Sequence, residues 1–212
     1  MNFRARFNRC VAIAGLCLFP ISVAQAQSAQ NPPSSSPDMQ SQMQQALAAA
    51  RPGVQHAQLM KLAGDYTTKE TFYAPGSEPQ ESTGTAKLKA ILGGRFLEEE
   101  NSGKSLGQPY SGLRLYGYNN GSKQYEAIWI YDGSTAILVL DGTSDDNGKT
   151  VRYSGAFLGP TGEKQTLRIT ITQNDVDHFI VKLLGENAGG MSTLETVYSR
   201  FRKSAPAPRY RK

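Results

Sequence analysis

The chain has 212 residues and a formal charge of +5 at pH 7, a length that limits it to one folded domain of ordinary size. The positive charge is concentrated at the two ends, because Arg4, Arg6 and Arg9 precede an apolar run and six basic residues lie among the last 13. The chain between these ends carries 14 basic and 18 acidic residues, which excludes the basic surface of a nucleic-acid-binding protein.

The first 26 residues have the three parts of a cleavable secretory signal peptide. The arginines form a positive region, residues 11–23 form a short apolar region, and Ala24 and Ala26 are the small residues before a cut after Ala26. We expect a periplasmic or secreted protein without a transmembrane segment after cleavage, because the apolar run is too short to remain as an anchor. Cleavage would also remove Cys10 and Cys17, the two cysteines of the chain.

Residues 27–54 are rich in Gln, Ser, Pro and Ala. A segment with so few large apolar side chains cannot offset its conformational entropy by burial, so its composition predicts a disordered tether. Residues 39–50 within it have high helix propensity but are polar nearly all round, which predicts a transient helix at most.

We expect the folded domain to span residues 55–202. It begins with a short helix that places His56, Leu59 and Leu62 on one side and ends before Gly64. Turn signals, such as Asn-Asn-Gly at 119–121, then alternate with short segments rich in Tyr, Thr, Ile, Val and Leu. This pattern predicts an all-β fold of roughly ten antiparallel strands, a meander that closes into a sandwich or barrel.

One hairpin in the middle of the domain is apolar on both faces. Tyr125 and Trp129 lie on one face with Ile128 and Ile130 on the other, and residues 136–140 are apolar on both. Such a hairpin needs cover from the short helix, from a partner subunit or from the other wall of a flattened barrel. The pattern therefore indicates a homodimer as one alternative.

Four sequence blocks resemble those of an uncharacterised bacterial family, domain-of-unknown-function family 1579. The blocks are His-x-x-Leu-x-x-Leu-x-Gly-x-Tyr at 56–66, Ile-Leu-Gly-Gly-Arg-Phe-Leu-Glu at 91–98, Leu-Tyr-Gly-Tyr-Asn at 115–119 and Ala-Ile-Trp at 127–129. The resemblance covers nearly the whole predicted domain. It implies a lipocalin-like or calycin-like barrel and supplies no catalytic residues.

A second resemblance, to lipocalin-type barrels, concerns how the barrel ends close. These barrels begin with a short helix and Gly-x-Trp, and an arginine on the last strand packs over that ring by a cation–π contact. Here Gly64 and Tyr66 occupy the first motif, with Tyr in place of Trp, and Arg200 or Arg202 would supply the cation. The resemblance implies a structural role for Gly64, Tyr66 and Arg200.

A barrel with aromatic side chains on neighbouring strands is expected to bind a small, largely apolar ligand in its lumen. The same rings would instead fill a solid core if the barrel has no cavity. The residues predicted to line the lumen are Tyr116, Tyr118, Tyr125, Trp129, Tyr131 and Tyr153.

The acidic run at 98–100 is the first place to look for acid–base chemistry. On a strand, Glu98 and Glu100 share one face and Glu99 points to the other, which separates their carboxylates, and a charged strand edge explains the run equally well. Because motifs that supply a nucleophile are lacking, a non-catalytic protein is favoured over an enzyme. An enzyme would be indicated by a luminal pair of Arg95, Arg114 or Arg152 with Glu98 or Glu100.

We expect neither a metal nor a cofactor. His178 would bind haem only if it pointed into the lumen, but its strand places Phe179 and Val181 on the more apolar face, so His178 is expected at the solvent side or the rim. The loop 143–148 fails as a calcium site, because Ser154 stands where a bidentate Glu is needed.

The basic tail, residues 203–212, contains Ala-Pro-Ala-Pro, which favours a disordered extension. Its alternative role is contact with anionic lipid or polysaccharide of a cell envelope. Together with the two-sided hairpin, the tail defines the alternative function: an envelope interaction or dimerisation module without a small-molecule ligand.

Overall fold

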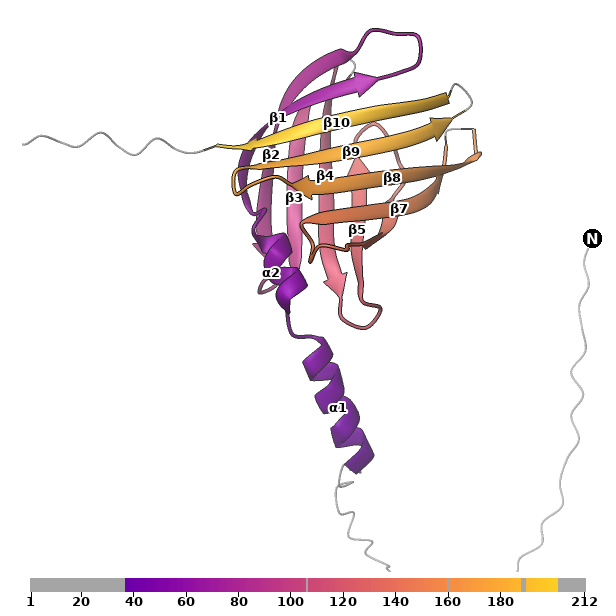
Figure 1. Ribbon diagram of the computed structural model, residues 1–212. Coiled ribbons are helices and arrows are strands. Elements are labelled where there is room, and N and C mark those ends of the chain that lie inside the picture. The colour runs from indigo at the N-terminus through magenta and orange to yellow at the C-terminus, as the bar shows by residue number, and fades with distance from the viewer. Residues whose placement is uncertain (1–36, 106, 160, 188–189, 202–212) are drawn as a thin grey trace, which may run out of the picture. The chain divides into compact units, whose positions relative to one another are not determined.

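The computed structural model describes residues 37–105, 107–159, 161–187 and 190–201 (Figure 1). The predicted signal peptide, residues 27–36 of the predicted tether, Arg202 and the basic tail lie outside the described residues. Among those described, no helix is long and apolar enough to cross a membrane.

Two helices precede ten strands in the described part of the chain (Figure 1). The elements are α1 (Pro37–Ala49), α2 (Val54–Met60), β1 (Gly64–Tyr73), β2 (Gln80–Ile91), β3 (Phe96–Ser105), β4 (Gln108–Asn119), β5 (Gln124–Tyr131), β6 (Leu138–Thr143), β7 (Thr150–Leu158), β8 (Lys164–Gln173), β9 (His178–Asn187) and β10 (Gly190–Arg200).

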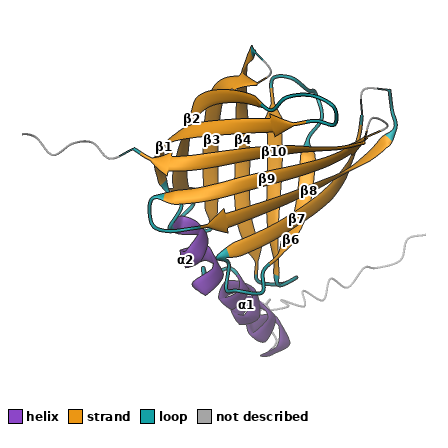
Figure 2. Cartoon of the chain, turned by 45° about the horizontal axis from the view of Figure 1, so that its top comes forward, coloured by secondary structure: helices purple, strands orange, loops and turns teal. Residues whose placement is uncertain are grey.

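The ten strands form one closed antiparallel barrel (Figure 2). Each strand pairs with its neighbours in the sequence, and β1 pairs with β10, where Tyr66 lies opposite Arg200. Closure of the sheet pairs both edges of every strand described. The predicted antiparallel meander that closes into a barrel is thereby confirmed.

Alternation along each strand decides which side chains form the core. In β5, Tyr125, Ala127 and Trp129 are buried inside the barrel, while Glu126 and Ile128 between them are exposed outside. The largest apolar side chains with almost no exposure come from β3, β6, β8 and β10 and meet in the lumen.

The short helix α2 lies at the end of the barrel where β1 begins and packs against β3 and β4 (Figure 1). The backbone N–H of Gly53 donates a hydrogen bond to Nδ1 of His56 at 3.0 Å, which satisfies one of the free N–H groups at the start of the helix. His56 is buried, and its ring meets the ring of Tyr118 edge to face at 5.8 Å. His56 thus joins α2 to β4.

Helix α1 lies in the segment for which the composition predicts a transient helix at most. Its residues from Asp38 onward are all exposed, so burial of an apolar face does not explain why it forms. The segment is rich in Ala, Gln and Met, and their helix propensity is the physical reason for the difference. The role of residues 27–54 as a tether stays a prediction.

Candidate functional site

The barrel lumen contains a cavity of about 510 Å³ at the end away from α2. Its walls come from strands on both sides of the barrel. The apolar side chains that line it are Trp129, Leu138, Phe157, Leu167, Leu183 and Leu194. Polar side chains from β1, β3 and β4 on one side of the same cavity are Glu70, Asn101, Tyr110 and Arg114, and Gln165 comes from β8 on the other side.

Glu99 is the centre of a buried hydrogen-bond network next to this cavity, with only 1% of its surface exposed. Its Oε1 accepts hydrogen bonds from Arg114 Nη1 at 2.9 Å and from the hydroxyl of Tyr198 at 2.8 Å. Asn101 Nδ2 donates to the same oxygen at 3.1 Å, and the hydroxyl of Tyr116 donates to Oε2 at 3.0 Å. Four donors therefore surround one carboxylate.

The charges in this network stabilise one another. Burial is the largest single influence on the pKa of Arg114 and would lower it, but the charge of Glu99, together with smaller contributions from the surrounding tyrosines, outweighs burial and holds the pKa well above its ordinary value. Burial raises the pKa of Tyr116 and of Tyr198, so both hydroxyls remain protonated donors. Because its acceptor sites are occupied, Glu99 is suited to hold β3, β4 and β10 together rather than to remove a proton from a substrate.

Arg114 and Trp129 meet at the boundary between this network and the cavity. The guanidinium carbon of Arg114 lies 4.1 Å from the centroid of the Trp129 ring, a cation–π contact. Both residues line the cavity, so the ion pair and the indole ring together bound one side of it.

A second buried hydrogen bond joins β4 to β1 along the inner face of the barrel, across β2 and β3. The hydroxyl of Tyr110 donates to Oε1 of Glu70 at 2.5 Å. Gly84 and Gly103 lie opposite each other on the two intervening strands and leave room for the tyrosine ring. A Cβ at Gly103 would lie 2.9 Å from the Cα of Gly84 and 3.3 Å from the ring of Tyr110. Burial, and then the hydrogen bond to Glu70, raise the pKa of Tyr110.

The structure divides the six predicted lining residues into two groups. Trp129 and Tyr131 border the cavity. The other four lie nearer α2, where their rings pack on one another, with Tyr118 and Tyr125 at 5.0 Å and Tyr116 and Tyr153 at 6.2 Å between centroids. A ligand-lining role for the six stays a prediction.

An Arg–Glu pair does lie in the lumen, but its acidic partner is Glu99. The pair that would have indicated an enzyme required Glu98 or Glu100 in the lumen, and neither carboxylate lies there. Both point outward to Lys89, whose Nζ lies 3.6 Å from Glu98 and 2.9 Å from Glu100. The reason is the phase of β3, which turns its odd-numbered side chains, and so Glu99, inward.

The other two arginines considered for a luminal pair also lie outside the lumen. Arg152 forms an exposed ion pair with Asp145 at 3.0 Å. Arg95, in the turn before β3, donates to the backbone carbonyl oxygens of Leu92 in the same turn and of Ala50, which follows α1. Of the three arginines, Arg114 alone faces inward.

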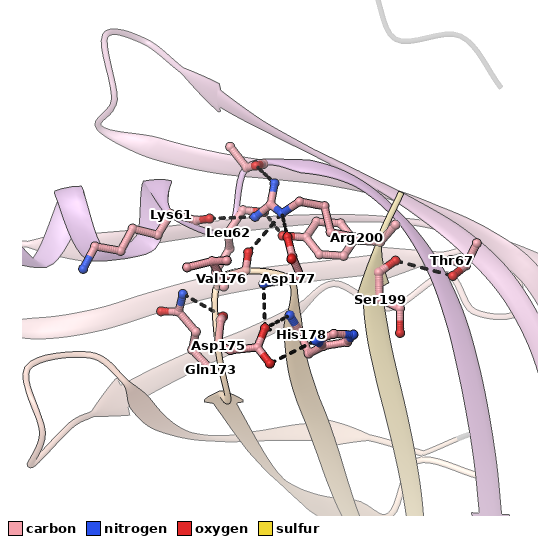
Figure 3. Close-up of polar contacts among 12 residues, drawn as sticks. Lys61, Leu62, Thr67, Gln173, Asp175, Val176, Asp177, His178, Ser199 and Arg200 are labelled. Atoms are coloured by element: carbon pink, nitrogen blue, oxygen red, sulfur yellow. Dashed lines mark hydrogen bonds and ion pairs between the residues drawn. The ribbon is translucent and has the colours of Figure 1, made fainter. Parts of the chain in front are cut away.

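Arg200 joins several segments at the end of the barrel that α2 covers (Figure 3). Its guanidinium carbon lies 4.9 Å from the centroid of the Tyr66 ring. Nη1 donates to the carbonyl oxygen of Ala63 at 2.6 Å, Nη2 to that of Lys61 at 2.9 Å and Nε to that of Val176 at 3.1 Å. These bonds satisfy carbonyl groups that follow α2 and tie them to the turn before β9.

Gly64 leaves space for this guanidinium, because a Cβ at that position would collide with Nη1 of Arg200. The structure thus brings Gly64, Tyr66 and Arg200 into one cluster at the covered end, as the lipocalin resemblance implies. Arg202, the other arginine considered, lies outside the described residues.

His178 is the first residue of β9, and its side chain is exposed next to the preceding turn (Figure 3). Its Nδ1 is 3.0 Å from the carboxylate oxygens of Asp175. In the part of the chain that the structure describes, no group of three or more His, Cys, Asp or Glu side chains is placed to hold a metal ion.

These features define a ten-stranded lipocalin-like barrel that is covered at one end by a helix and has a cavity at the other. The chain belongs to the family described as "Protein of unknown function (DUF1579)", which matches residues 51–200. The family resemblance seen in the sequence is thereby confirmed. None of the curated proteins matches this chain.

Two solved structures share the fold. Rv2717c from M. tuberculosis is 18% identical, with a TM-score of 0.51, over 72% of this chain and 100% of that one. The S-type phycobiliprotein lyase CPES from Guillardia theta is 8% identical, with a TM-score of 0.52, over 74% of this chain and 98% of that one. Identities this low show a common fold and nothing about function.

Proposed function

We propose that this protein is a non-catalytic barrel that binds a small, largely apolar ligand in its lumen. The observation that carries the proposal is the cavity of about 510 Å³, with largely apolar walls and few polar groups. Cavities of roughly 300–1,000 Å³ with this division between apolar walls and few polar groups are typical of small-molecule sites.

The division of the lumen into two halves also supports the proposal. Near α2 the aromatic rings pack on one another, as in a solid core. Away from α2 the side chains leave space. Trp129 lies between the two halves, and its ring packs edge to face on that of Tyr116, with 6.4 Å between the ring centroids. One end of the barrel thereby stabilises the fold while the other holds the ligand.

The test is native mass spectrometry of the protein expressed with its own N-terminal segment and purified under gentle conditions. Two variants of β10 form a matched pair: Ser192→Trp places a bulky ring in the cavity, whereas Ser199→Trp places one on the outer face. We expect extra mass that is lost on mild activation for the wild type and for Ser199→Trp, and none for Ser192→Trp. Bare wild-type protein, or bound mass that survives in Ser192→Trp, would overturn the proposal.

We further propose that the protein is exported to the periplasm or secreted. The support is the sequence of the first 26 residues, with its positive region, short apolar region and small residues before the cut. N-terminal sequencing of the protein recovered from a periplasmic extract should give a chain that starts at Gln27. Recovery of uncut protein from the cytoplasm would contradict export.

A second candidate function is dimerisation through the outer face of β4, β5 and β6. Apolar side chains on and beside these strands are 38–65% exposed, and they form what we call the outer apolar patch. Its residues are Leu113, Ile128, Ile130, Ile137 and Val139. Three of them also border an outer groove of about 990 Å³. Exposed patches of this kind are typical of interaction sites, and the occupant proposed is a second copy of the chain.

The mass of the protein in solution, measured by sedimentation over a range of concentrations, tests this candidate. We expect a dimer that Ile130→Glu converts to a monomer, whereas Thr143→Glu, an exposed position on β6, leaves it unchanged. A wild-type monomer at every concentration would exclude the candidate.

Contact of the basic tail with an anionic envelope belongs to the same alternative. Its support is the positive charge of residues 203–212. Each basic residue near an anionic membrane surface contributes on the order of 1 kcal/mol to binding. Vesicles that contain anionic lipid should retain the full chain and not a chain that ends at residue 202. Equal retention of the two chains would contradict this role.

A further inference from the structure

Glu70 differs from the other luminal carboxylate in what surrounds it. It is 5% exposed, lines the cavity and accepts one hydrogen bond from Tyr110, but it has no ion-pair partner among the described residues. Glu99, by contrast, has Arg114 and three further donors. A buried carboxylate without a cation is costly, so a positive group placed beside Glu70 would stabilise the complex.

The remaining charges at the cavity do not supply that positive group. Arg114 is the single cation among the described residues that line it, and its charge is offset by Glu99 at 2.9 Å. Asp132 at the mouth is a second carboxylate, held by the backbone N–H and the hydroxyl of Ser111. The formal charge facing the cavity is therefore negative.

Asn101 adds a second acceptor to the same wall. Its Nδ2 donates to Glu99, and its Oδ1 is buried without a hydrogen-bond partner among the described residues. The indole Nε1 of Trp129 is likewise unpartnered, and among the described residues it is the one such donor at the cavity. A buried polar atom without a partner costs about 1–3 kcal/mol, so Oδ1 of Asn101 favours a ligand that donates a hydrogen bond to it, whereas Nε1 of Trp129 is a donor and does not contribute to this preference.

We propose that the ligand is an amphipathic amine, in which an apolar body carries an ammonium or amidinium group. This inference rests on the proposed function and names its ligand class. The apolar body lies among the leucines and Phe157, and the cationic group donates hydrogen bonds to the free oxygen of Glu70 and to Oδ1 of Asn101. Hydrogen bonds that involve a charged donor and acceptor are roughly twice as strong as neutral ones, which makes Glu70 the residue that selects the charge.

The experiment compares three probes with the same apolar chain: decylamine, 1-decanol and decanoate. Trp129 is the single tryptophan of the chain and lines the cavity, so its fluorescence reports occupancy, and calorimetry provides an independent affinity. The variants are Glu70→Gln, which removes the luminal charge, and Glu126→Gln, which removes an exposed charge on the outer face of β5. Near-UV circular dichroism checks that both variants are folded.

We expect wild type and Glu126→Gln to bind decylamine at least about tenfold more tightly than 1-decanol, and decanoate more weakly than 1-decanol. In Glu70→Gln the preference for the amine should fall to nearly none, while 1-decanol still binds. Equal or tighter binding of decanoate by the wild type would overturn the inference and leave the proposed function standing, as would an amine preference that persists in Glu70→Gln. If none of the three probes binds, the inference and the luminal binding site fail together.

Discussion

Arg114 and Glu99 lie directly opposite each other on β4 and β3, and both point into the barrel, where Nη1 and Oε1 are 2.9 Å apart. Taking two charges out of water is unfavourable, and their attraction offsets this only when the remaining donors and acceptors are also satisfied. Tyr116, Tyr198 and Asn101 complete the hydrogen bonds of Glu99. The ion pair is therefore a fixed part of the barrel interior, and each of its two charges depends on the other for compensation.

Removal of one partner of this pair should destabilise the protein strongly. We expect Glu99→Leu to lower the free energy of unfolding by about 3–5 kcal/mol, because Arg114 is left as a buried charge without its partner. The double variant Glu99→Leu, Arg114→Met should lose clearly less than the sum of the single variants, as urea unfolding would measure. Glu100→Gln, at the exposed pair with Lys89, is the control and should change little. Additive single effects would show that the pair is not coupled.

Arg200→Ala should loosen the end of the barrel at α2. It removes three hydrogen bonds to carbonyl oxygens and the contact with Tyr66, and we expect a loss of about 2–4 kcal/mol in the free energy of unfolding. Arg200→Lys should recover only part of this, because one ammonium cannot reproduce the planar set of donors. The control is Arg168→Ala on the exposed face of β8. Equal stability of the two alanine variants would argue against a closing role.

Gly103→Ala should disturb the hydrogen bond from Tyr110 to Glu70 and the packing of the tyrosine ring over Gly103. The added methyl group would meet the backbone of Gly84 at 2.9 Å, the carbonyl oxygen of Thr83 at 3.0 Å and the tyrosine ring at 3.3 Å, so the two strands must shift. Overpacking of this kind costs about 1–3 kcal/mol, measurable by urea unfolding. Gly185→Ala in β9 is the matched control, because its methyl group meets only the hydroxyl of Ser192 at 3.4 Å. A similar loss in both variants would locate the effect in strand propensity instead.

Stability should fall as the pH drops below about 6.5, the ordinary pKa of histidine. Burial lowers the pKa of His56 in the folded chain, so below that pH the unfolded chain takes up a proton that the folded chain does not. Protonation would also remove the acceptor that Nδ1 offers to the N–H of Gly53. His56→Gln should flatten this part of the profile of unfolding free energy against pH, and His178→Asn, at the exposed histidine, should not. A wild-type profile that is level from pH 7 to pH 5 would refute the prediction.

The sequence alone was sufficient to predict the barrel, because its signals are local. Turn residues such as those at 119–121 mark strand ends, and alternation within β5 separates Tyr125 and Trp129 from Ile128. The resemblance to lipocalin-type barrels implied how the barrel end closes, and Gly64, Tyr66 and Arg200 do lie together.

The sequence by itself also determined that Glu99 would face away from Glu98 and Glu100, since side chains on a strand alternate. Only the tertiary structure decided which side was the inside, because this run carries carboxylates on both faces and so has no apolar side to identify the core. The cavity, too, was decided only by the tertiary structure, because its lining side chains come from strands that are distant in the sequence. Tyr110 and Glu70 are 40 residues apart and meet across the two strands between them, and Tyr198 and Glu99 are 99 residues apart and meet only because β10 pairs with β1.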